Sequence, residues 1–474
     1  MFARIKKWMP ALLVLVLAAA SGCQVGPKYQ APKATAPAAF GNLRASATTN
    51  QVEAEWWQGL KDEKLTQLVQ QASTNNHDIK IFTARLLEAR ALWREARFDY
   101  YPTATANASY QNSQSSLATN PNESRSGRHR QLYQAGLDAS WELDLFGAVR
   151  RSVDAAKATV EAVEADRDSV LVSVRAEVAI NYLLLRGGQA QLDVARRNAT
   201  NQVETLRVAE ALLNGGRGTQ LDVARAKTLL STTLASIPPL EAAIDRTIHR
   251  LSVLTGQVPR ALAESLLKEA PLPVLPRELA MLEPTELLRR RPDIRAAERA
   301  LAAATARIGV ATADLFPRVS FNGRMALEAT RFSGFVDSGN EAWAFGPRIT
   351  WAAFDLGRVR AQIKAADARA EGSLNIYEQT VLLALEETEN ALTSFGREQV
   401  RLGHLRDAEA AAREAALLAR KRYQDGVSDF LTVLDAERTL LSSQEQHVLS
   451  QVSAATALVS VYKSMGGGWP DALR

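Results

Sequence analysis

Apolar and polar side chains alternate along four short stretches of the chain. The clearest is "YQAGLDASWELDLFG", residues 133–147, in which apolar or aromatic residues alternate with small, polar or acidic ones. This period of two predicts a β-strand with one apolar and one polar face. The other stretches share the pattern, and we expect four strands, over residues 102–112, 131–145, 317–328 and 342–354.

The polar faces of these strands carry charged side chains, which limits where the strands can lie. The charged residues are Asp138, Glu142, Asp144, Arg324, Glu328 and Arg348. A soluble sandwich with its polar side in water would show the same alternation. However, strands of about 10 to 12 residues can cross a bilayer when tilted, and here they come in pairs. We therefore favour membrane-spanning strands whose charged residues face a water-filled lumen.

Four strands are too few to close a barrel within one chain. Natural transmembrane barrels have eight strands or more, and open sheet edges are not tolerated in lipid. The sheet must then be shared between copies of the chain. Two copies would give eight strands around a filled interior, whereas three would give twelve strands and room for water around the charged residues.

Two long stretches without proline carry a helical pattern instead. Residues 147–213 and 357–424 place Val, Leu and Ala three and four residues apart, which is the spacing of one helix face. At 1.5 Å per residue, about 67 residues make a helix roughly 100 Å long, about the width of a periplasm. Helices over residues 218–256 and 428–465 return through glycine-containing turns. A fibrous coiled coil is the alternative, but such alanine-rich helices suit a wall of antiparallel helices.

The two halves of the chain repeat each other at an offset of about 210 to 215 residues. "NNHDIK" at residues 75–80 matches "RRPDIR" at residues 290–295, and "WELDLFGAVR" matches "WAAFDLGRVR". These matches predict a tandem duplication of one unit: helix, two strands, long helix and returning helix. We expect a signal peptide over residues 1–22, an irregular segment over 23–61, a first repeat over 62–256, an equatorial linker over 257–283, a second repeat over 284–465 and a tail over 466–474.

The N-terminus has the features of a lipoprotein signal. Basic residues precede an apolar core over residues 11–20, which is too short to span a bilayer, and small residues lead to Cys23. Cys23 is the only cysteine, so no intrachain disulfide can form. We expect an N-acyl diacylglycerol on Cys23 and no other cofactor. An ordinary signal peptide with an incidental cysteine is the alternative, since Ala20 stands where such signals usually carry leucine.

The charge and the spacing of reactive residues exclude several function classes. Beyond the first 22 residues the chain has 54 basic and 52 acidic residues, which argues against a nucleic-acid-binding protein. The five histidines are scattered, and none has the HExxH spacing of a zinc site. Neither a phosphate-binding loop nor a nucleophile elbow is present. We predict that the chain is not an enzyme and binds no metal.

Several longer motifs carry a family resemblance. They are "WWQGLKDEKLTQLVQQA", "ELDLFGAVRR", "ELLRRRPDIRAAE", "LFPRVS", "RYQDGVSDFLTVLDAERTLL" and "YKSMGGGW". With these motifs the chain resembles the outer membrane factors of the TolC and OprM type, in their lipoprotein, NodT-like branch. The resemblance implies a mixed α and β membrane protein: a homotrimer with a twelve-stranded outer-membrane β-barrel over a long periplasmic α-helical barrel, lipid-anchored in the outer membrane.

The resemblance also implies partners and a function. A periplasmic adaptor would join the trimer to an inner-membrane pump, most often of the RND type, and the trimer would be a passive exit duct for small molecules. Metal-ion efflux and type I polypeptide secretion are alternatives within the same class of channel. A structural coiled-coil lipoprotein is a remote alternative, because it would not need paired amphipathic strands.

Matching motifs further imply a periplasmic gate and a docking surface. The implied gate residues are Asp435 as an acidic ring, Leu431 as an apolar constriction, and Arg438 and Tyr423 as tethers. The implied adaptor-contacting tips are Gly215, Gly216, Gly218, Gly426 and Val427. Ser428 and Thr432 depart from the TolC pattern, so the resemblance implies a gate with one aspartate per chain. Thr219 and Asp429 are placed to cap the returning helices.

Overall fold

A computed structural model describes most of the chain. The described residues are 24–33, 36–41, 47–48, 55–276, 279–280 and 283–467. Cys23 and the expected signal peptide lie outside them. The chain forms two compact units: a sheet unit of Met1–Lys33, Arg85–Glu164 and Ala296–Glu378, and a tip unit of Ala34–Ala84, Ala165–Arg295 and Gln379–Arg474. Each unit therefore takes segments from both repeats.

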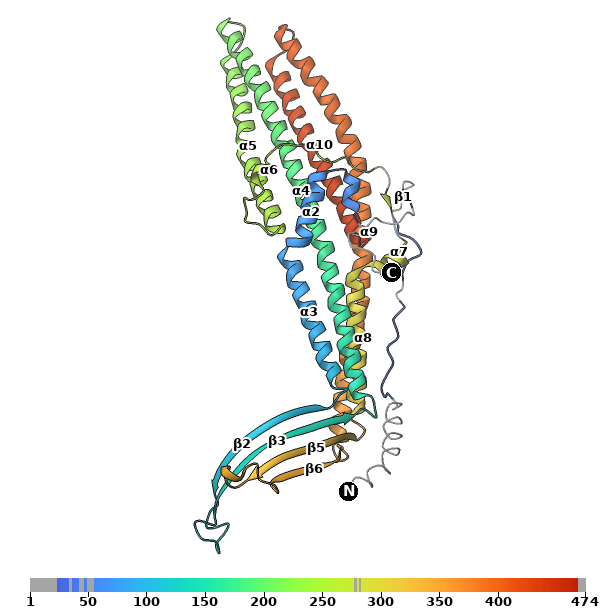
Figure 1. The fold of residues 1–474 in the computed structure, drawn as a ribbon. Helices are drawn as coiled ribbons and strands as arrows, with labels where there is room; N and C mark the ends of the chain where they lie inside the picture. The colour runs from blue at the N-terminus through green and yellow to red at the C-terminus, as the bar shows by residue number, and fades with distance from the viewer. Residues whose placement is uncertain are drawn as a thin grey trace. The chain divides into compact units, whose positions relative to one another are not determined.

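The sheet unit holds one antiparallel sheet of four strands (Figure 1). The strands are β2 (Thr103–Gln114), β3 (His129–Leu143), β5 (Arg318–Ala329) and β6 (Glu341–Thr350). Their order is β2-β3-β5-β6, so one hairpin comes from each repeat and the hairpins join through the pairing of β3 with β5. Strands β2 and β6 are left at the edges.

The register of this sheet separates the two predicted faces. Asp138 is paired with Thr105 on one side and with Arg324 on the other, which puts polar residues in one row. On the opposite face Leu137 is paired with Met325, and Met325 with Trp343. These three side chains are 53%, 60% and 66% exposed. Within the described part of the chain, the apolar face of the sheet is thus left uncovered.

Four helices correspond to the two long helices and the two returning helices that the sequence predicted. They are α4 (Ala148–Asn214, 67 residues), α5 (Gln220–Leu254), α9 (Leu356–Gln424, 69 residues) and α10 (Phe430–Ser464). Helix α5 runs through Pro238 and Pro239 without ending. None of the helices in the described ranges has both the length and the hydropathy that a membrane-crossing helix requires.

The first helix of each repeat is split, where the sequence predicted one helix. The first pair is α2 (Glu63–Asn75) and α3 (His77–Phe98), which break at Asn76, whose side chain accepts the Asp78 amide and so caps α3. The second pair is α7 (Pro284–Arg290) and α8 (Pro292–Ala313). They break at Arg291, which is extended (ψ 122°) because a proline follows it.

Smaller elements occupy the segments that were expected to be irregular. They are a 3-10 helix η1 (Trp56–Leu60), α6 (Ala263–Leu266), and two short strands, β1 (Ala47–Thr48) and β4 (Leu279–Ala280), which pair in parallel. A second 3-10 turn, η2 (Phe332–Gly334), lies in the loop between β5 and β6.

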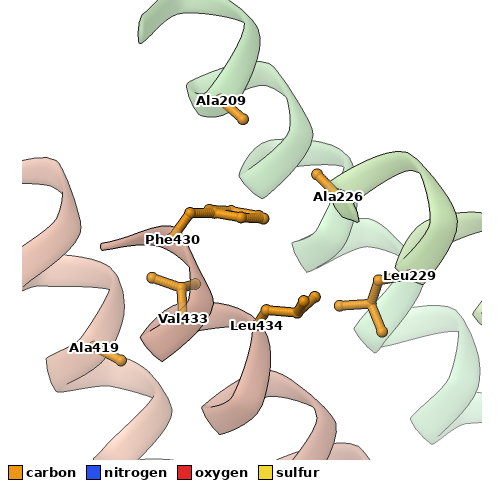
Figure 2. Close-up of a cluster of buried hydrophobic side chains, with 7 residues drawn as sticks. All are labelled: Ala209, Ala226, Leu229, Ala419, Phe430, Val433 and Leu434. Atoms are coloured by element: carbon orange, nitrogen blue, oxygen red, sulfur yellow. The ribbon is translucent and has the colours of Figure 1, made fainter. Parts of the chain in front are cut away.

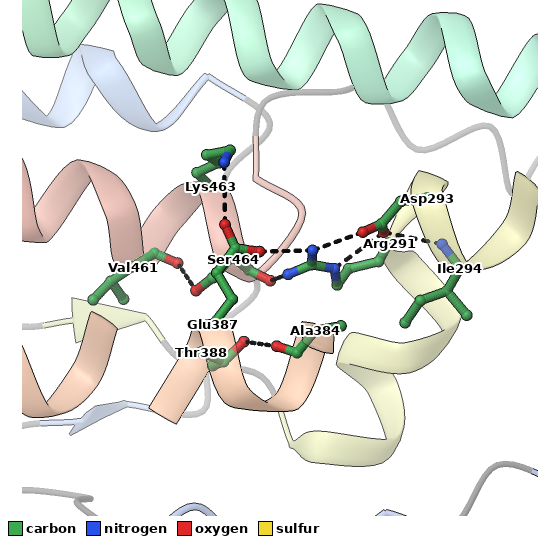
Figure 3. A network of polar contacts seen from close by, with 9 residues as sticks. All are labelled: Arg291, Asp293, Ile294, Ala384, Glu387, Thr388, Val461, Lys463 and Ser464. Carbon is green, nitrogen blue, oxygen red and sulfur yellow. Dashed lines mark hydrogen bonds and ion pairs between the residues drawn. The ribbon is translucent and has the colours of Figure 1, made fainter. Parts of the chain in front are cut away.

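Arg291 of the "RRPDI" motif makes polar contacts with residues of α8, α9 and α10 (Figure 3). The guanidinium group is buried, with the residue 8% exposed, and it donates to Asp293, to Glu387 of α9 at 2.8 Å and to the Ser464 carbonyl at 2.7 Å. Lys463 adds a second cation to Glu387 at 3.1 Å. Burial would raise the pKa of Glu387, but the bonds and charges of Arg291 and Lys463 lower it below its ordinary value. One side chain thus joins the start of α8 to α9 and to the end of α10.

We expect Arg291→Lys to lower the free energy of unfolding by about 2 kcal/mol, because an ammonium group cannot reproduce the forked contacts of a buried guanidinium. The measurement is denaturant unfolding of the purified protein in detergent, followed by circular dichroism. Arg289→Lys is the matched control, since Arg289 is exposed. Equal stability of the two variants would contradict the role given to Arg291.

Candidate functional site

Two helical hairpins end in tight turns in the tip unit. Residues 215–219 join α4 to α5, and residues 425–429 join α9 to α10. Gly216 and Gly426 have φ angles of +68° and +76°, which glycine adopts without strain. All five residues predicted as adaptor-contacting tips lie in these two turns. Contact with an adaptor stays a prediction.

The helices that return from the turns are capped as the sequence predicted. The Thr219 hydroxyl accepts the Asp222 amide at 3.2 Å, and the Asp222 carboxylate accepts the Thr219 amide, which forms a capping box for α5. Asp429 accepts the Thr432 amide at 3.0 Å and its hydroxyl at 2.7 Å at the start of α10. These bonds lower the pKa of Asp429. Each tip therefore has a fixed geometry.

Just behind the turns, the two hairpins share a buried apolar cluster, here called the tip cluster (Figure 2). Its members are Ala209 of α4, Ala226 and Leu229 of α5, Ala419 of α9, and Phe430, Val433 and Leu434 of α10. Phe430 is the largest member, and the centroid of its ring lies 5.3 Å from the centroid of the Tyr423 ring. The cluster packs α10 against both helices of the first hairpin.

Three of the four implied gate residues share one face of α10. Leu431, Asp435 and Arg438 are exposed and follow the i, i+4, i+7 spacing of a single helix face. Phe430 and Val433, by contrast, point into the tip cluster. Within the described part of the chain, no ion pair joins Asp435 to Arg438. The gate face is therefore free to meet groups outside this chain.

Tyr423 lies apart from this face. Its ring packs against the tip cluster, and its hydroxyl is buried without a hydrogen-bond partner in the described residues. Burial raises the pKa of Tyr423, and the nearby charge of Asp222 raises it further. The side chain borders a cavity of about 200 Å³ that Thr205 and Arg420 also line. Its role as a tether stays a prediction.

Glu437 is the residue of this region that sequence reasoning missed. It is 3% exposed, and its Oε1 accepts 2.7 Å hydrogen bonds from Arg420 Nε of α9 and Thr205 Oγ1 of α4. The sequence does carry a signal that this carboxylate is buried and paired, because Glu437 lies on the same face of α10 as Phe430 and Val433. A charge on an apolar helix face is rarely buried unless it is paired.

Five of the six charged residues predicted for a lumen share the polar face of the sheet. The ion pairs there are Arg324 with Asp138 at 3.9 Å, Arg324 with Glu328 at 2.8 Å, and Arg318 with Glu142 at 3.7 Å. Arg348 lines the same groove of about 510 Å³ as Asp138 and Arg324. That this face borders a lumen stays a prediction.

Asp144 was wrongly grouped with these residues. Strand β3 ends at Leu143, before Asp144, and the Asp144 carboxylate turns to the start of α4. It accepts the amides of Val149 at 3.1 Å and Arg150 at 2.9 Å, and it pairs with the Arg150 side chain at 3.0 Å. A carboxylate at this position stabilises a helix N-terminus, because the first amides of a helix lack partners within it.

Across the described ranges, no group of three or more His, Cys, Asp or Glu side chains could hold a metal ion.

Comparison with known proteins finds similarity over almost the whole chain. A family model described as "Outer membrane efflux protein" matches residues 68–257 and 284–467. The solvent efflux pump outer membrane protein SrpC of Pseudomonas putida is 32% identical over 474 residues, 98% of each chain. Nodulation protein T of Rhizobium leguminosarum bv. trifolii is 30% identical over 425 residues, 90% of each chain. The solved outer-membrane channel OprN is 43% identical, with a TM-score of 0.88 over 94% of this chain and 100% of its own.

We expect Phe430→Ala to loosen the tip cluster. Truncating a buried phenylalanine lowers the free energy of unfolding by about 3–5 kcal/mol, because buried apolar area is lost and a cavity remains. Hydrogen exchange of the amides flanking both turns should become faster, while exchange in the sheet unit stays unchanged. Leu431→Ala is the control, since it truncates the adjacent, exposed side chain. Faster exchange in both variants, or in neither, would contradict the tip cluster as the element that orders the tips.

Proposed function

The chain belongs to the outer membrane efflux protein family, as its motifs predicted, and we propose that it is the outer-membrane exit duct of a tripartite efflux system. The observation that carries the proposal is the combination, in one chain, of a two-faced open sheet with two capped helical hairpins, one of which exposes Asp435 and Arg438 near its tip. An inner-membrane pump, of the RND type, and a periplasmic adaptor would complete the system. The adaptor would dock on the two turns.

The sheet supports assembly into a homotrimer. Among the described residues, strands β2 and β6 have no partner on their outer sides, and an unpaired edge cannot be left in lipid. Three copies would close twelve strands, with the apolar faces toward lipid and the charged faces around water. The exposed Leu137, Met325 and Trp343 would then be covered by acyl chains.

The N-terminal segment supports Cys23 as a lipid anchor of this trimer. The Val25 amide donates to the Phe146 carbonyl at 3.2 Å, and Gln24 Nε2 donates to Asp154 at 3.0 Å, both in the sheet unit. Arg151 holds the same segment by donating to the carbonyl oxygens of Val25 and Gly26. An acyl group on the residue before Gln24 would therefore start beside the end of β3, close to the bilayer.

The cargo class follows from the relatives and is part of the proposal. SrpC is by its name a solvent efflux protein, and we propose small, largely apolar toxic molecules as the cargo here. The duct itself would be passive and would catalyse no reaction. Transport energy would come from the pump.

The assembly is tested by two neighbouring substitutions on β6. Phe345→Arg places a charge on the apolar face, where an arginine near the bilayer centre costs about 2–4 kcal/mol. Gly346→Arg places the same charge on the polar face, where a side chain would meet open space. We expect a heat-modifiable trimer on gels for the wild type and Gly346→Arg, and its loss for Phe345→Arg. A trimer that tolerates Phe345→Arg, or a detergent-free soluble protein, would refute membrane insertion through this sheet.

The gate is tested by Asp435→Ala. Three aspartates around a threefold axis would bind cations and narrow the pore. Removing them should therefore raise ion conductance in planar bilayers. Asp245→Ala, at an exposed position of α5, is the control and should leave conductance unchanged. Equal conductance of the two variants would count against the assigned gate face.

A further inference from the structure

The arginines on strands β5 and β6 differ in their partners. Two of them each hold two carboxylates, in the ion pairs Arg324–Glu328, Arg324–Asp138, Arg318–Asp314 and Arg318–Glu142. The third, Arg348 of β6, is exposed, and within the described part of the chain its side chain has no ion pair and no hydrogen bond. Its neighbour across the ladder on β5 is Ser320, which carries no charge. Arg348 therefore keeps an unpaired guanidinium group on the polar face of the sheet.

Closing the barrel would not supply the missing partner. Strand β6 is an edge of the sheet, and in the proposed trimer it would pair with the other edge, β2, of a second copy. Strand β2 carries no charged residue over its whole length. The carboxylates of β3, Asp138 and Glu142, lie one strand further away and already hold arginines. Three copies would therefore bring three unpaired guanidinium groups to the lumen.

Arg348 lines the groove of about 510 Å³ on the polar face of the sheet. The charged groups along this groove are two guanidinium groups and one carboxylate, from Arg348, Arg324 and Asp138, so one positive charge is in excess. Gly346 leaves space beside Arg348, because a Cβ added there would meet no atom within 4 Å. A groove of this volume is in the range that holds a small organic molecule.

Uncharged groups separate the two arginines of the groove. Arg348 stands four residues along β6 from Ala344, the ladder partner of Arg324, which is about 13 Å of strand. The row between them holds Ser140 and Asn322, and the Ser140 hydroxyl donates to Asn322 Oδ1 at 2.9 Å. These side chains satisfy each other and carry no charge. Of the three charged groups in the groove, only Arg348 is left to bind a ligand.

Building on the duct proposed above, we propose that Arg348 and the groove beside it form a binding site for small organic anions that carry a carboxylate or sulfonate group. A guanidinium group can donate two parallel hydrogen bonds to such a group. The rest of the molecule would lie in the open space over Gly346. The site adds apolar molecules with one acidic group to the cargo class, and it makes Arg348 the residue that selects them.

The test is block of the ionic current through purified Asp435→Ala trimers in planar bilayers. Benzenesulfonate is the probe, and benzenesulfonamide is its uncharged analogue of similar shape. We expect the sulfonate to block the current and the sulfonamide to have no effect. Arg348→Gln should raise the sulfonate concentration needed for half block about tenfold, as for the loss of a hydrogen bond between charged groups.

Arg130→Gln is the matched control. It removes the same charge from the same face of the sheet, because Arg130 is exposed on β3 eight residues from Asp138, and it does not line the groove. We expect block by benzenesulfonate to be unchanged in this variant. Equal block in Arg348→Gln and Arg130→Gln, or equal block by the sulfonate and the sulfonamide, would overturn the proposal.

Arg348→Lys separates a binding site from a general effect of charge. It keeps the positive charge, so the reversal potential in a potassium chloride gradient should stay as in the parent. The block by benzenesulfonate should weaken several-fold, because an ammonium group cannot form the forked contact. Full block in Arg348→Lys would refute recognition by the guanidinium group.

The same recordings distinguish failure of this site from failure of the duct. If Asp435→Ala trimers conduct and benzenesulfonate blocks every variant equally, the site is refuted and the duct stands. If trimers form but neither the wild type nor Asp435→Ala conducts, the proposed function fails, and the site fails with it.

Discussion

A two-faced sheet with unpaired edges is the constraint on which the rest of this molecule depends. Its apolar face, with Met325 and Trp343 exposed, is covered by no other part of the described chain. The edge strands β2 and β6 carry backbone groups that need partners. The described residues of one chain solve neither problem. Shared strands and a surrounding bilayer solve both, because closure pairs the edges and lipid covers the apolar face.

The tandem duplication gives the tip unit two helical hairpins of the same construction. Both repeats build a capped helical hairpin, and the tip cluster joins the two hairpins. The repeats differ in the residues that their returning helices carry. The second repeat carries Asp435 and Glu437 on opposite faces of α10, one exposed and one buried. The exposed face is available to other copies of the chain, while the buried face fixes the position of α10 against α4.

Local patterns in the sequence predicted the elements well, and contacts between distant residues were harder to predict. A period of two placed Asp138 and Arg324 on one face because side-chain direction in a strand depends only on position. The same rule failed at Asp144, since alternation continues past the last ladder pair, where the carboxylate turns to cap α4. The break at Arg291 had a local signal in the proline that follows it.

The sequence places Glu437 on the apolar face of α10, but it does not identify the partners of this carboxylate. Its partners Arg420 and Thr205 are 17 and 232 residues away along the chain, and no periodicity reveals which of two facing helices supplies a hydroxyl. The implied gate residues Leu431, Asp435 and Arg438 were easier to group, because their spacing alone places them on one helix face.

The central claim is that one chain is a third of a closed assembly, with its sheet edges paired to other copies. Native mass spectrometry of the detergent-extracted protein, with the detergent removed in the gas phase, measures this most directly. We predict a particle of three times the mass of the processed chain. A particle of one or two chain masses, under conditions that keep the protein folded, would contradict the account.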